Sequence, residues 1–366
     1  MEHKDERVSP LKVNEGVAQP EQVNPEAVGR LRSLRPSLLP SDEYVQGILK
    51  GDVVLLSKAI TLVESSLPQH QELARQITGA CVPHTGKAVR LGITGVPGAG
   101  KSTFIEALGT HLTEAGKKVA VLAIDPSSQR SRGSILGDKT RMEQLATNPM
   151  AYIRPSASAG TLGGVARKTR ETMILCEAAG FDTVIVETVG VGQSETAVHS
   201  MVDFFLLLMI GGAGDELQGI KRGIMEMADG IVINKADGDN IARANRAKAE
   251  CENALHLFPS AESGFNPRVT TCSALTGFNI EGVWQMVNEY MQLTGENGFL
   301  TEKRSRQAVQ ALYDTIENGL KEQFFGRPEI NNRLPLLEQQ IINGQITAYE
   351  AARELLDMPD ISQQEQ

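Results

Sequence analysis

The sequence predicts an α/β fold in which a mostly parallel sheet carries helices on both faces. Between residues 89 and 293, short apolar runs alternate with stretches of helical periodicity, and this alternation is typical of a parallel sheet. The first apolar run leads into GVPGAGKS, a glycine-rich loop that a helical stretch follows. Together these observations predict a phosphate-binding domain of the P-loop NTPase type, with its ligand at the carboxyl ends of the strands.

The predicted elements divide the 366 residues into four regions. Residues 1–40 are polar and rich in proline, so we expect a disordered tail. Residues 41–87 form a small helical region of three helices, the third opened by Pro68. Residues 88–297 form the nucleotide-binding domain. Residues 298–366 form a C-terminal helical arm, which either packs back on this domain or reaches a second subunit.

Seven apolar runs are the predicted strands. They lie at residues 89–94, 119–124, 151–154, 184–187, 204–210, 230–234 and 268–272. The predicted helices between them include 103–115 and 162–179. In the arm we expect helices at 302–325, 334–342 and 347–356, the last beginning with a capping box.

The bulk composition is that of an ordinary globular protein, with 41% hydrophobic and 22% charged residues. The formal net charge of −9 argues against nucleic acid as a partner, because a surface that binds nucleic acid would be basic. The longest strongly apolar run, residues 204–210, is too short to cross a bilayer, and the N-terminus lacks a signal-peptide pattern. The four cysteines form no CxxC pair. We therefore expect a cytoplasmic protein that binds no membrane.

The glycine-rich loop matches G-x-x-x-x-G-K-[ST], a pattern that binds phosphate. Its glycines let backbone N–H groups turn toward an anion, at the start of a helix whose dipole adds positive potential. Lys101 would reach the β- and γ-phosphates, and the Ser102 hydroxyl would bind Mg²⁺. The predicted phosphate-binding residues are Gly95, Val96, Pro97, Gly98, Ala99, Gly100, Lys101, Ser102 and Thr103.

A second motif, N-K-A-D, follows the predicted strand at 230–234 and indicates guanine as the base. The Asp237 carboxylate can accept hydrogen bonds from N1–H and the 2-amino group of guanine. Adenine offers neither group and would leave the buried carboxylate unpaired. The S-A-L segment after the last predicted strand resembles the loop that GTPases close on the guanine O6. The predicted guanine-binding residues are Asn234, Lys235, Asp237, Ser273, Ala274 and Leu275.

Three acids complete the predicted magnesium site. Glu187 ends the strand at 184–187, while Asp125 and Asp138 follow the strand at 119–124. Carboxylates bind Mg²⁺ directly or through water, and one of these acids could instead orient the attacking water. Most GTPases have an aspartate where Glu187 stands. The predicted catalytic residues are Lys101, Asp125, Asp138 and Glu187, and the predicted metal ligands are Ser102, Asp125, Asp138 and Glu187.

These segments together resemble the MeaB/ArgK family of P-loop GTPases, which belongs to the same group as the nickel metallochaperone GTPases. The resemblance covers about residues 42–356. It rests on GVPGAGKST, AIDPSS, GSILGDKTRM, IVETVGVGQSE, GGAGDELQGIK, VINKADGDN and CSALTG. A glutamate at the position of Glu187 is typical of that group.

The resemblance implies a GTPase that binds GTP or GDP with Mg²⁺ and forms a homodimer through the C-terminal helical arm. It also implies a chaperone of adenosylcobalamin-dependent methylmalonyl-CoA mutase, which gates cofactor loading and protects the mutase from inactivation. Residues 125–138, 187–195 and 211–221 would be switches I, II and III. In switch III, Asp215, Gln218 and Lys221 would couple the nucleotide state to the mutase.

Other functions stay open at this stage. One is an ATPase or kinase linked to lysine/arginine/ornithine transport, although N-K-A-D argues against ATP. Another is a nickel-delivery GTPase, but between Gly100 and Glu187 the chain has one histidine, His111, and one cysteine, Cys176. A nucleotide-binding scaffold without turnover is a third. Because no arginine or glutamine is obviously placed to complete the site, we expect slow intrinsic hydrolysis that a partner stimulates.

Overall fold

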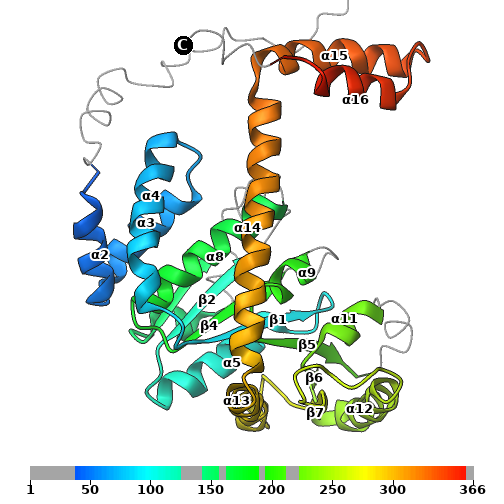
Figure 1. The fold of residues 1–366 in the computed structure, drawn as a ribbon. Helices are drawn as coiled ribbons and strands as arrows, with labels where there is room; N and C mark the ends of the chain where they lie inside the picture. The colour runs from blue at the N-terminus through cyan, green and yellow to red at the C-terminus, as the bar shows by residue number, and fades with distance from the viewer. Residues whose placement is uncertain (1–37, 125–141, 156–161, 189–193, 212–221, 360–366) are drawn as a thin grey trace, which may run out of the picture. The chain divides into compact units, whose positions relative to one another are not determined.

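The computed structural model describes residues 38–124, 142–155, 162–188, 194–211 and 222–359 (Figure 1). All the helices and strands described below belong to one compact unit that begins at Ser41. Most of the predicted tail lies outside these ranges. So do five predicted site residues: Asp125, Asp138, Asp215, Gln218 and Lys221. Within the described ranges, no helix is both long and apolar enough to cross a membrane.

Seven strands form one sheet in the order β3-β2-β4-β1-β5-β6-β7, and every neighbouring pair is parallel. The strands are β1 (Val89–Gly95), β2 (Val119–Ile124), β3 (Ala151–Pro155), β4 (Thr183–Thr188), β5 (Phe204–Ile210), β6 (Gly230–Asn234) and β7 (Arg268–Thr271). All seven predicted strands are confirmed, with each end within one residue of the prediction. They are apolar throughout because helices cover both faces.

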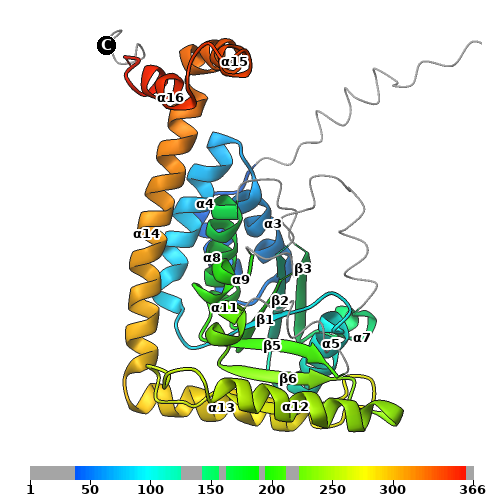
Figure 2. The ribbon, with the colours of Figure 1, turned by 90° about the vertical axis from the view of Figure 1, so that its right-hand side faces the viewer.

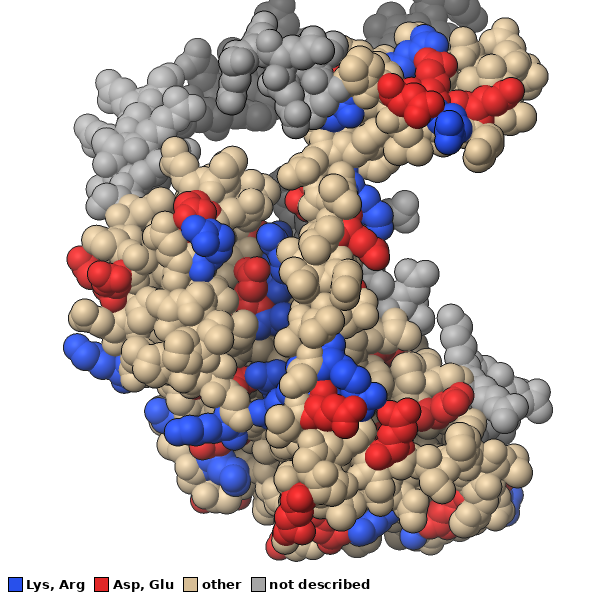
Figure 3. Space-filling model, viewed as in Figure 1, with Lys and Arg blue, Asp and Glu red and all other residues tan. Residues whose placement is uncertain are grey.

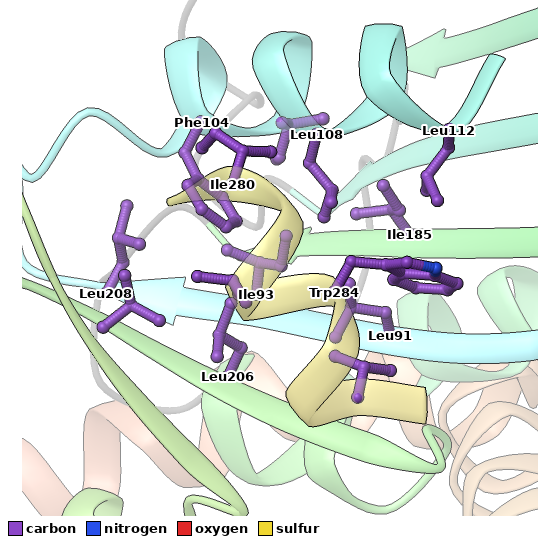
Figure 4. Packing of buried hydrophobic residues seen from close by; sticks show 14 of the residues in the cluster. Leu91, Ile93, Phe104, Leu108, Leu112, Ile185, Leu206, Leu208, Ile280 and Trp284 are labelled. Carbon is purple, nitrogen blue, oxygen red and sulfur yellow. The ribbon is translucent and has the colours of Figure 1, made fainter. Parts of the chain in front are cut away.

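Two helices, α5 (Lys101–Glu114) and α13 (Ile280–Glu296), pack on one face of the sheet. Side chains alternate along a strand, so Leu91 and Ile93 of β1 both point to this face (Figure 4). Trp284 of α13 lies over them in the same buried cluster. A short helix, α7 (Glu143–Thr147), packs against α5 and β3.

Four helices cover the opposite face: α8 (Leu162–Ala178), α9 (Ser194–His199), α11 (Arg222–Met227) and α12 (Ile241–Leu255). Gly92 of β1 lies on this face. A Cβ at Gly92 would come within 2.9 Å of the side chains of Val198 and Val202. The glycine therefore lets the end of α9 pack directly on the central strand.

The predicted N-terminal helices are α2 (Ser41–Leu49), α3 (Val53–Glu64) and α4 (Pro68–Cys81), and all three pack against α8. The Asp52 side chain caps α3 by accepting hydrogen bonds from two backbone N–H groups, and Pro68 occupies the first turn of α4, as predicted. Short 3₁₀ turns, η1 (Val82–His84) and η3 (Gly238–Asn240), follow α4 and β6.

An aspartate stands directly before each of β4, β5 and β6, and its carboxylate accepts a hydrogen bond from a backbone N–H at the start of the next strand in the sheet. These pairs are Asp182 with Lys118 (2.7 Å), Asp203 with Arg90 (2.9 Å) and Asp229 with Phe205 (2.8 Å). The sequence analysis did not identify this repeated pattern. It joins the strands at the edge of the sheet where they begin.

The C-terminal helices are α14 (Phe299–Gly326), α15 (Pro328–Ile342) and α16 (Ala348–Leu356) (Figure 2). The predicted start of the second helix at residue 334 is wrong, because α15 begins at Pro328. Proline is favoured in the first turn of a helix, because a backbone N–H at that position would have no partner within the helix. Pro328 therefore prevents α14 from continuing and also begins α15. The predicted capping box of α16 is confirmed in Thr347 and Glu350.

His199, at the end of α9, generates a prediction about pH. Burial and, to a lesser degree, the Lys303 ammonium lower the pKa of this imidazole from 6.5 to about 4. The folded state thus favours neutral His199, so its stabilising effect is complete above pH 6.5 and is lost as the pH falls toward 4. Because His199 is only partly buried, we expect a loss of about 2 kcal/mol in the free energy of unfolding.

Urea denaturation of the wild type and of His199→Gln across this pH range checks the prediction. The variant should lose less stability than the wild type, because it lacks the titrating group. His256→Gln removes an exposed histidine after α12 and should behave as the wild type. Equal losses in all three proteins would contradict the prediction.

Candidate nucleotide-binding site

The described candidate residues gather at one edge of the sheet. Because all the strands are parallel, the loops that follow β1, β4, β6 and β7 leave the sheet on the same side. These loops carry the glycine-rich loop, Glu187, the N-K-A-D segment and the S-A-L segment. This is the position at which ligands bind such sheets.

Two glycines shape the turn between β1 and α5. Gly95 has a φ of +156°, and a Cβ there would lie 2.2 Å from the carbonyl oxygen of Leu208. Gly100 has a φ of +84° and caps α5, which begins at Lys101, two residues earlier than predicted. The first N–H groups of α5 therefore follow the loop directly and, with the helix dipole, favour an anion there.

The Lys101 ammonium lies against the loop. Its Nζ donates to the carbonyl oxygens of Gly95 (2.8 Å) and Val96 (3.4 Å). Burial lowers the pKa of Lys101, and the carboxylates of Glu187 and Glu195 partly oppose this effect. A half-buried cation whose hydrogen-bond acceptors are neutral oxygens is incompletely compensated, so a phosphate would interact with it strongly.

Ser102 and Glu187 form an oxygen pair at the ends of α5 and β4. The Ser102 Oγ donates to the Glu187 Oε1 at 3.3 Å, and the glutamate is 8% exposed. Neighbouring ligands of an octahedral Mg²⁺ ion lie about 3 Å apart. The donor chemistry and the spacing of these two oxygens therefore fit Mg²⁺.

Asn234 joins the glycine-rich loop to the S-A-L segment. Its Nδ2 donates to the Ala99 carbonyl oxygen at 2.9 Å. Its Oδ1 accepts from the Ala274 N–H at 3.1 Å and from the Cys272 Sγ at 3.4 Å. Since a carbonyl can only accept and an amide N–H can only donate, the two backbone partners determine how the carboxamide is oriented.

The N-K-A-D and S-A-L segments also meet directly. The Ser273 Oγ donates to the Asp237 Oδ2 at 2.5 Å, and the Ala236 N–H donates to the Cys272 carbonyl oxygen at 2.9 Å. Asp237 is half-buried, whereas the Leu275 side chain is 81% exposed. The structure thus brings together the acid and the backbone segment that the sequence analysis connected with guanine.

Three residues at this edge escaped the sequence analysis. Glu195 is a buried acid in the first turn of α9, and its charge favours the protonated form of Lys101. The only indication in the sequence was the presence of a second acid eight residues after Glu187. Cys272 donates to Asn234 from the position directly before S-A-L. Thr94 accepts a 2.9 Å hydrogen bond from Thr188, which follows Glu187, and nothing in the sequence pattern indicated this buried pair.

Comparison with known proteins gives consistent matches. The family model described as "Methylmalonyl Co-A mutase-associated GTPase MeaB" matches residues 56–329. A protein of Caulobacter vibrioides named as a GTPase is 51% identical over 318 residues, which cover 87% of this chain and 97% of that protein. The Mus musculus protein "Methylmalonic aciduria type A homolog, mitochondrial" is 45% identical over 325 residues, 86% of this chain and 78% of that protein.

A solved structure described as an LAO/AO transport system kinase has a TM-score of 0.69 and 39% sequence identity. The match covers 88% of this chain and 99% of that chain. The helical regions on either side of the sheet domain are therefore included in the likeness.

Lys101→Met is expected to weaken GDP binding about 10- to 100-fold, the range for losing charge-assisted hydrogen bonds.

The same substitution should not lower the melting temperature of the nucleotide-free protein, because burial of the charge disfavours the folded state. The lowered pKa also means that wild-type stability, but not that of the variant, rises at alkaline pH. Calorimetric GDP titration and thermal melts at neutral and alkaline pH measure both effects. Lys58→Met, at an exposed position on α3, is the control. A large loss of nucleotide-free stability specific to Lys101→Met would contradict this account.

Asp237→Asn should reverse the choice of base. An amide at this position cannot accept from both the N1–H and the 2-amino group of guanine, but it can accept from N1–H of xanthine and donate to its 2-oxo group. We expect GDP affinity to fall about 100-fold or more and xanthosine diphosphate affinity to rise. Competition binding with the two nucleotides measures the ratio. An unchanged ratio would show that another group reads the base.

Proposed function

Because this chain belongs to the MeaB family of GTPases, we propose that its GTP hydrolysis serves an adenosylcobalamin-dependent methylmalonyl-CoA mutase. In this proposal the chain is a chaperone that gates cofactor loading and protects the mutase from inactivation. The observation that carries the proposal is the match of residues 56–329 to a family whose description names that mutase. The mouse relative, named for methylmalonic aciduria, supports the same client.

Hydrolysis in this site depends on positioning and charge rather than on a covalent intermediate. Lys101 and the backbone N–H groups at the start of α5 hold the phosphates and stabilise the charge that develops on them. Ser102 and Glu187 hold Mg²⁺, which neutralises phosphate charge when bound. Asp125 and Asp138 complete the metal site or orient the attacking water. The residues from Gly95 to Thr103 form the phosphate-binding loop.

Guanine is bound by the two segments that meet at Asn234. Asp237 accepts from the base, and the Ser273 hydroxyl holds the carboxylate in place. The Ala274 N–H is held by Asn234, which orders the segment from Ser273 to Leu275 against the base. Lys235 has a φ of +58° and is exposed, so its aliphatic stem can cover one side of the ligand.

A second copy of the chain is the proposed partner of α14. Five apolar side chains of this helix are about half exposed or more, at helical spacing: Val309, Leu312, Tyr313, Ile316 and Leu320. Figure 3 shows that the face of α14 toward the viewer is largely uncharged. Exposed apolar stripes of this length mark protein interfaces, and a homodimer formed through the arm at 298–366 would cover this one.

Contact with the mutase is proposed to involve Asp215, Gln218 and Lys221. The net charge of −9 supports a protein that binds no nucleic acid, and a cytoplasmic location without membrane contact is the accompanying proposal. A second candidate function is a kinase linked to amino-acid transport, since one similar structure bears that description. Nickel delivery has weaker support, because the described residues include no group of three histidine, cysteine or acidic side chains placed to hold a metal.

The proposed function predicts that purified apo-mutase binds this chain and accelerates its GTP hydrolysis. Cofactor loading should differ between GTP, GDP and a non-hydrolysable GTP analogue. The measurements are phosphate release, the absorbance of bound cobalamin and light scattering during size exclusion. Light scattering also determines whether the 39.5 kDa chain is a dimer.

The Asp237→Asn variant provides the control for this experiment. It should respond to the mutase with xanthosine triphosphate and not with GTP, which would show that stimulation acts through this site. If the wild type neither binds the mutase nor changes its loading in any nucleotide state, the proposed client is wrong. Faster transfer of phosphate from ATP to a transport component would instead favour the second candidate.

A further inference from the structure

The short helix α9 connects the nucleotide edge of the sheet with the opposite edge. It follows β4, which ends with Glu187 and Thr188, and it leads into β5. Because β4 and β5 are parallel, the chain between them must return from the carboxyl edge to the amino edge. The first turn of α9 carries Glu195, whose carboxylate acts on Lys101.

The far end of α9 packs on the strand that leads into the phosphate loop. The side chains of Val198 and Val202 lie against Gly92 of β1, three residues before Gly95. His199 packs edge-on against Phe205, with ring centroids 5.5 Å apart. A displacement of α9 would therefore also change the packing against β1.

Residues of α14 bind the short segment between the end of α9 and the start of β5. The Gln307 Nε2 donates to the Val202 carbonyl oxygen at 2.8 Å. The Lys303 Nζ donates to the Asp203 carbonyl oxygen at 2.6 Å. The Arg304 guanidinium makes two hydrogen bonds to the Asp203 carboxylate, at 2.6 and 2.8 Å. Three residues within little more than one turn of α14 thus bind the two residues before β5.

A fourth contact comes through α8, which runs beside α14 (Figure 2). Arg170 donates from Nη2 to the Ser200 Oγ at 2.9 Å and from Nη1 to the Asp314 Oδ2 at 3.0 Å. One guanidinium therefore joins the segment after α9 to the middle of α14. The first four turns of α14 are in this way attached to the polypeptide that follows the catalytic strand β4.

Unsatisfied polar atoms gather around α9. Three buried side-chain atoms there have no hydrogen-bond partner within the part of the chain that the structure describes: Ser194 Oγ, Arg170 Nε and Gln307 Oε1. Buried polar atoms are normally paired, so each such group requires an explanation. Groups without partners at both ends of one helix are those that can gain hydrogen bonds when the helix shifts.

We propose that α14 positions α9 for GTP hydrolysis, with Gln307 as a positioning residue, and that the same contacts carry the nucleotide state to α14. The inference rests on the proposed place of Lys101 and Glu187 in the nucleotide site, but it does not depend on the client. Coupling of this kind is reciprocal for binding. Whatever covers the exposed apolar side chains of α14 would therefore alter nucleotide affinity at the opposite edge of the sheet.

Gln307→Met tests the proposal, because it removes the bond to Val202 while keeping the length of the side chain. Gln323→Met is the matched control, since Gln323 is exposed on the same helix and makes none of these contacts. Substitution of Arg304 is avoided, because it would remove the ion-pair partner of the buried Asp203 carboxylate and destabilise the fold as a whole. Ser200→Ala removes the Arg170 contact as an independent second variant.

We expect Gln307→Met and Ser200→Ala to lower kcat for GTP about 5- to 10-fold, with KM and GDP affinity changed less than about twofold. Hydrogen exchange of amides 303–314 should differ between the GDP-bound and GTP-analogue-bound wild type. Gln307→Met should abolish this difference, and Gln323→Met should keep it.

Two results would overturn the proposal. One is wild-type exchange at 303–314 that is the same in both nucleotide states. The other is a fall in GDP affinity or melting temperature that matches the fall in kcat, which would mean that α14 only stabilises the fold. A wild-type chain that binds GTP without hydrolysing it would instead contradict the proposed catalytic site.

Discussion

The parallel arrangement of all seven strands is the constraint on which the other features depend. It places every loop that follows a strand at one edge of the sheet, so segments as distant as Gly95 and Ser273 meet there. It also forces every crossover to return along a face of the sheet. The opposite edge then receives the aspartates that precede β4, β5 and β6, together with the start of α14. Binding and anchoring are therefore separated by the length of a strand.

At the edge where the strands end, side-chain hydrogen bonds connect backbone segments that are far apart in the sequence. Asn234 is the best example, because one carboxamide bonds the phosphate loop at Ala99 and the base segment at Ala274. The glycines make room for such contacts, since a Cβ at Gly100 would lie 2.9 Å from the Asn234 Nδ2. Lys101 does not stabilise the nucleotide-free site, because the partial burial of its charge is unfavourable until an anion binds. The described part of the site is therefore electrostatically suited to phosphate.

At the anchoring edge, α14 links the C-terminal helices to the sheet domain. Its early turns form an ion pair and hydrogen bonds with Val202 and Asp203, whereas its later turns expose apolar side chains. A partner that binds the exposed turns therefore contacts a helix already attached to the end of α9.

The sequence by itself determined the strands, the P-loop, the guanine motif and the family, because these features are encoded by short local patterns. Apolar runs bounded by polar residues define buried strands, and G-x-x-x-x-G-K-S needs only its own spacing to be recognised. The start of α15 was misplaced for a local reason, since Pro328 can both end one helix and begin another.

Only the tertiary structure decided which side chains meet across long separations. The Gln307 bond to Val202 spans 105 residues, and the Arg304 contact with Asp203 spans 101. The roles of Glu195, Cys272 and Gly92 likewise depend on neighbours from other elements. No local pattern records such contacts, because burial and hydrogen bonding are properties of the packed sheet and helices rather than of any single segment.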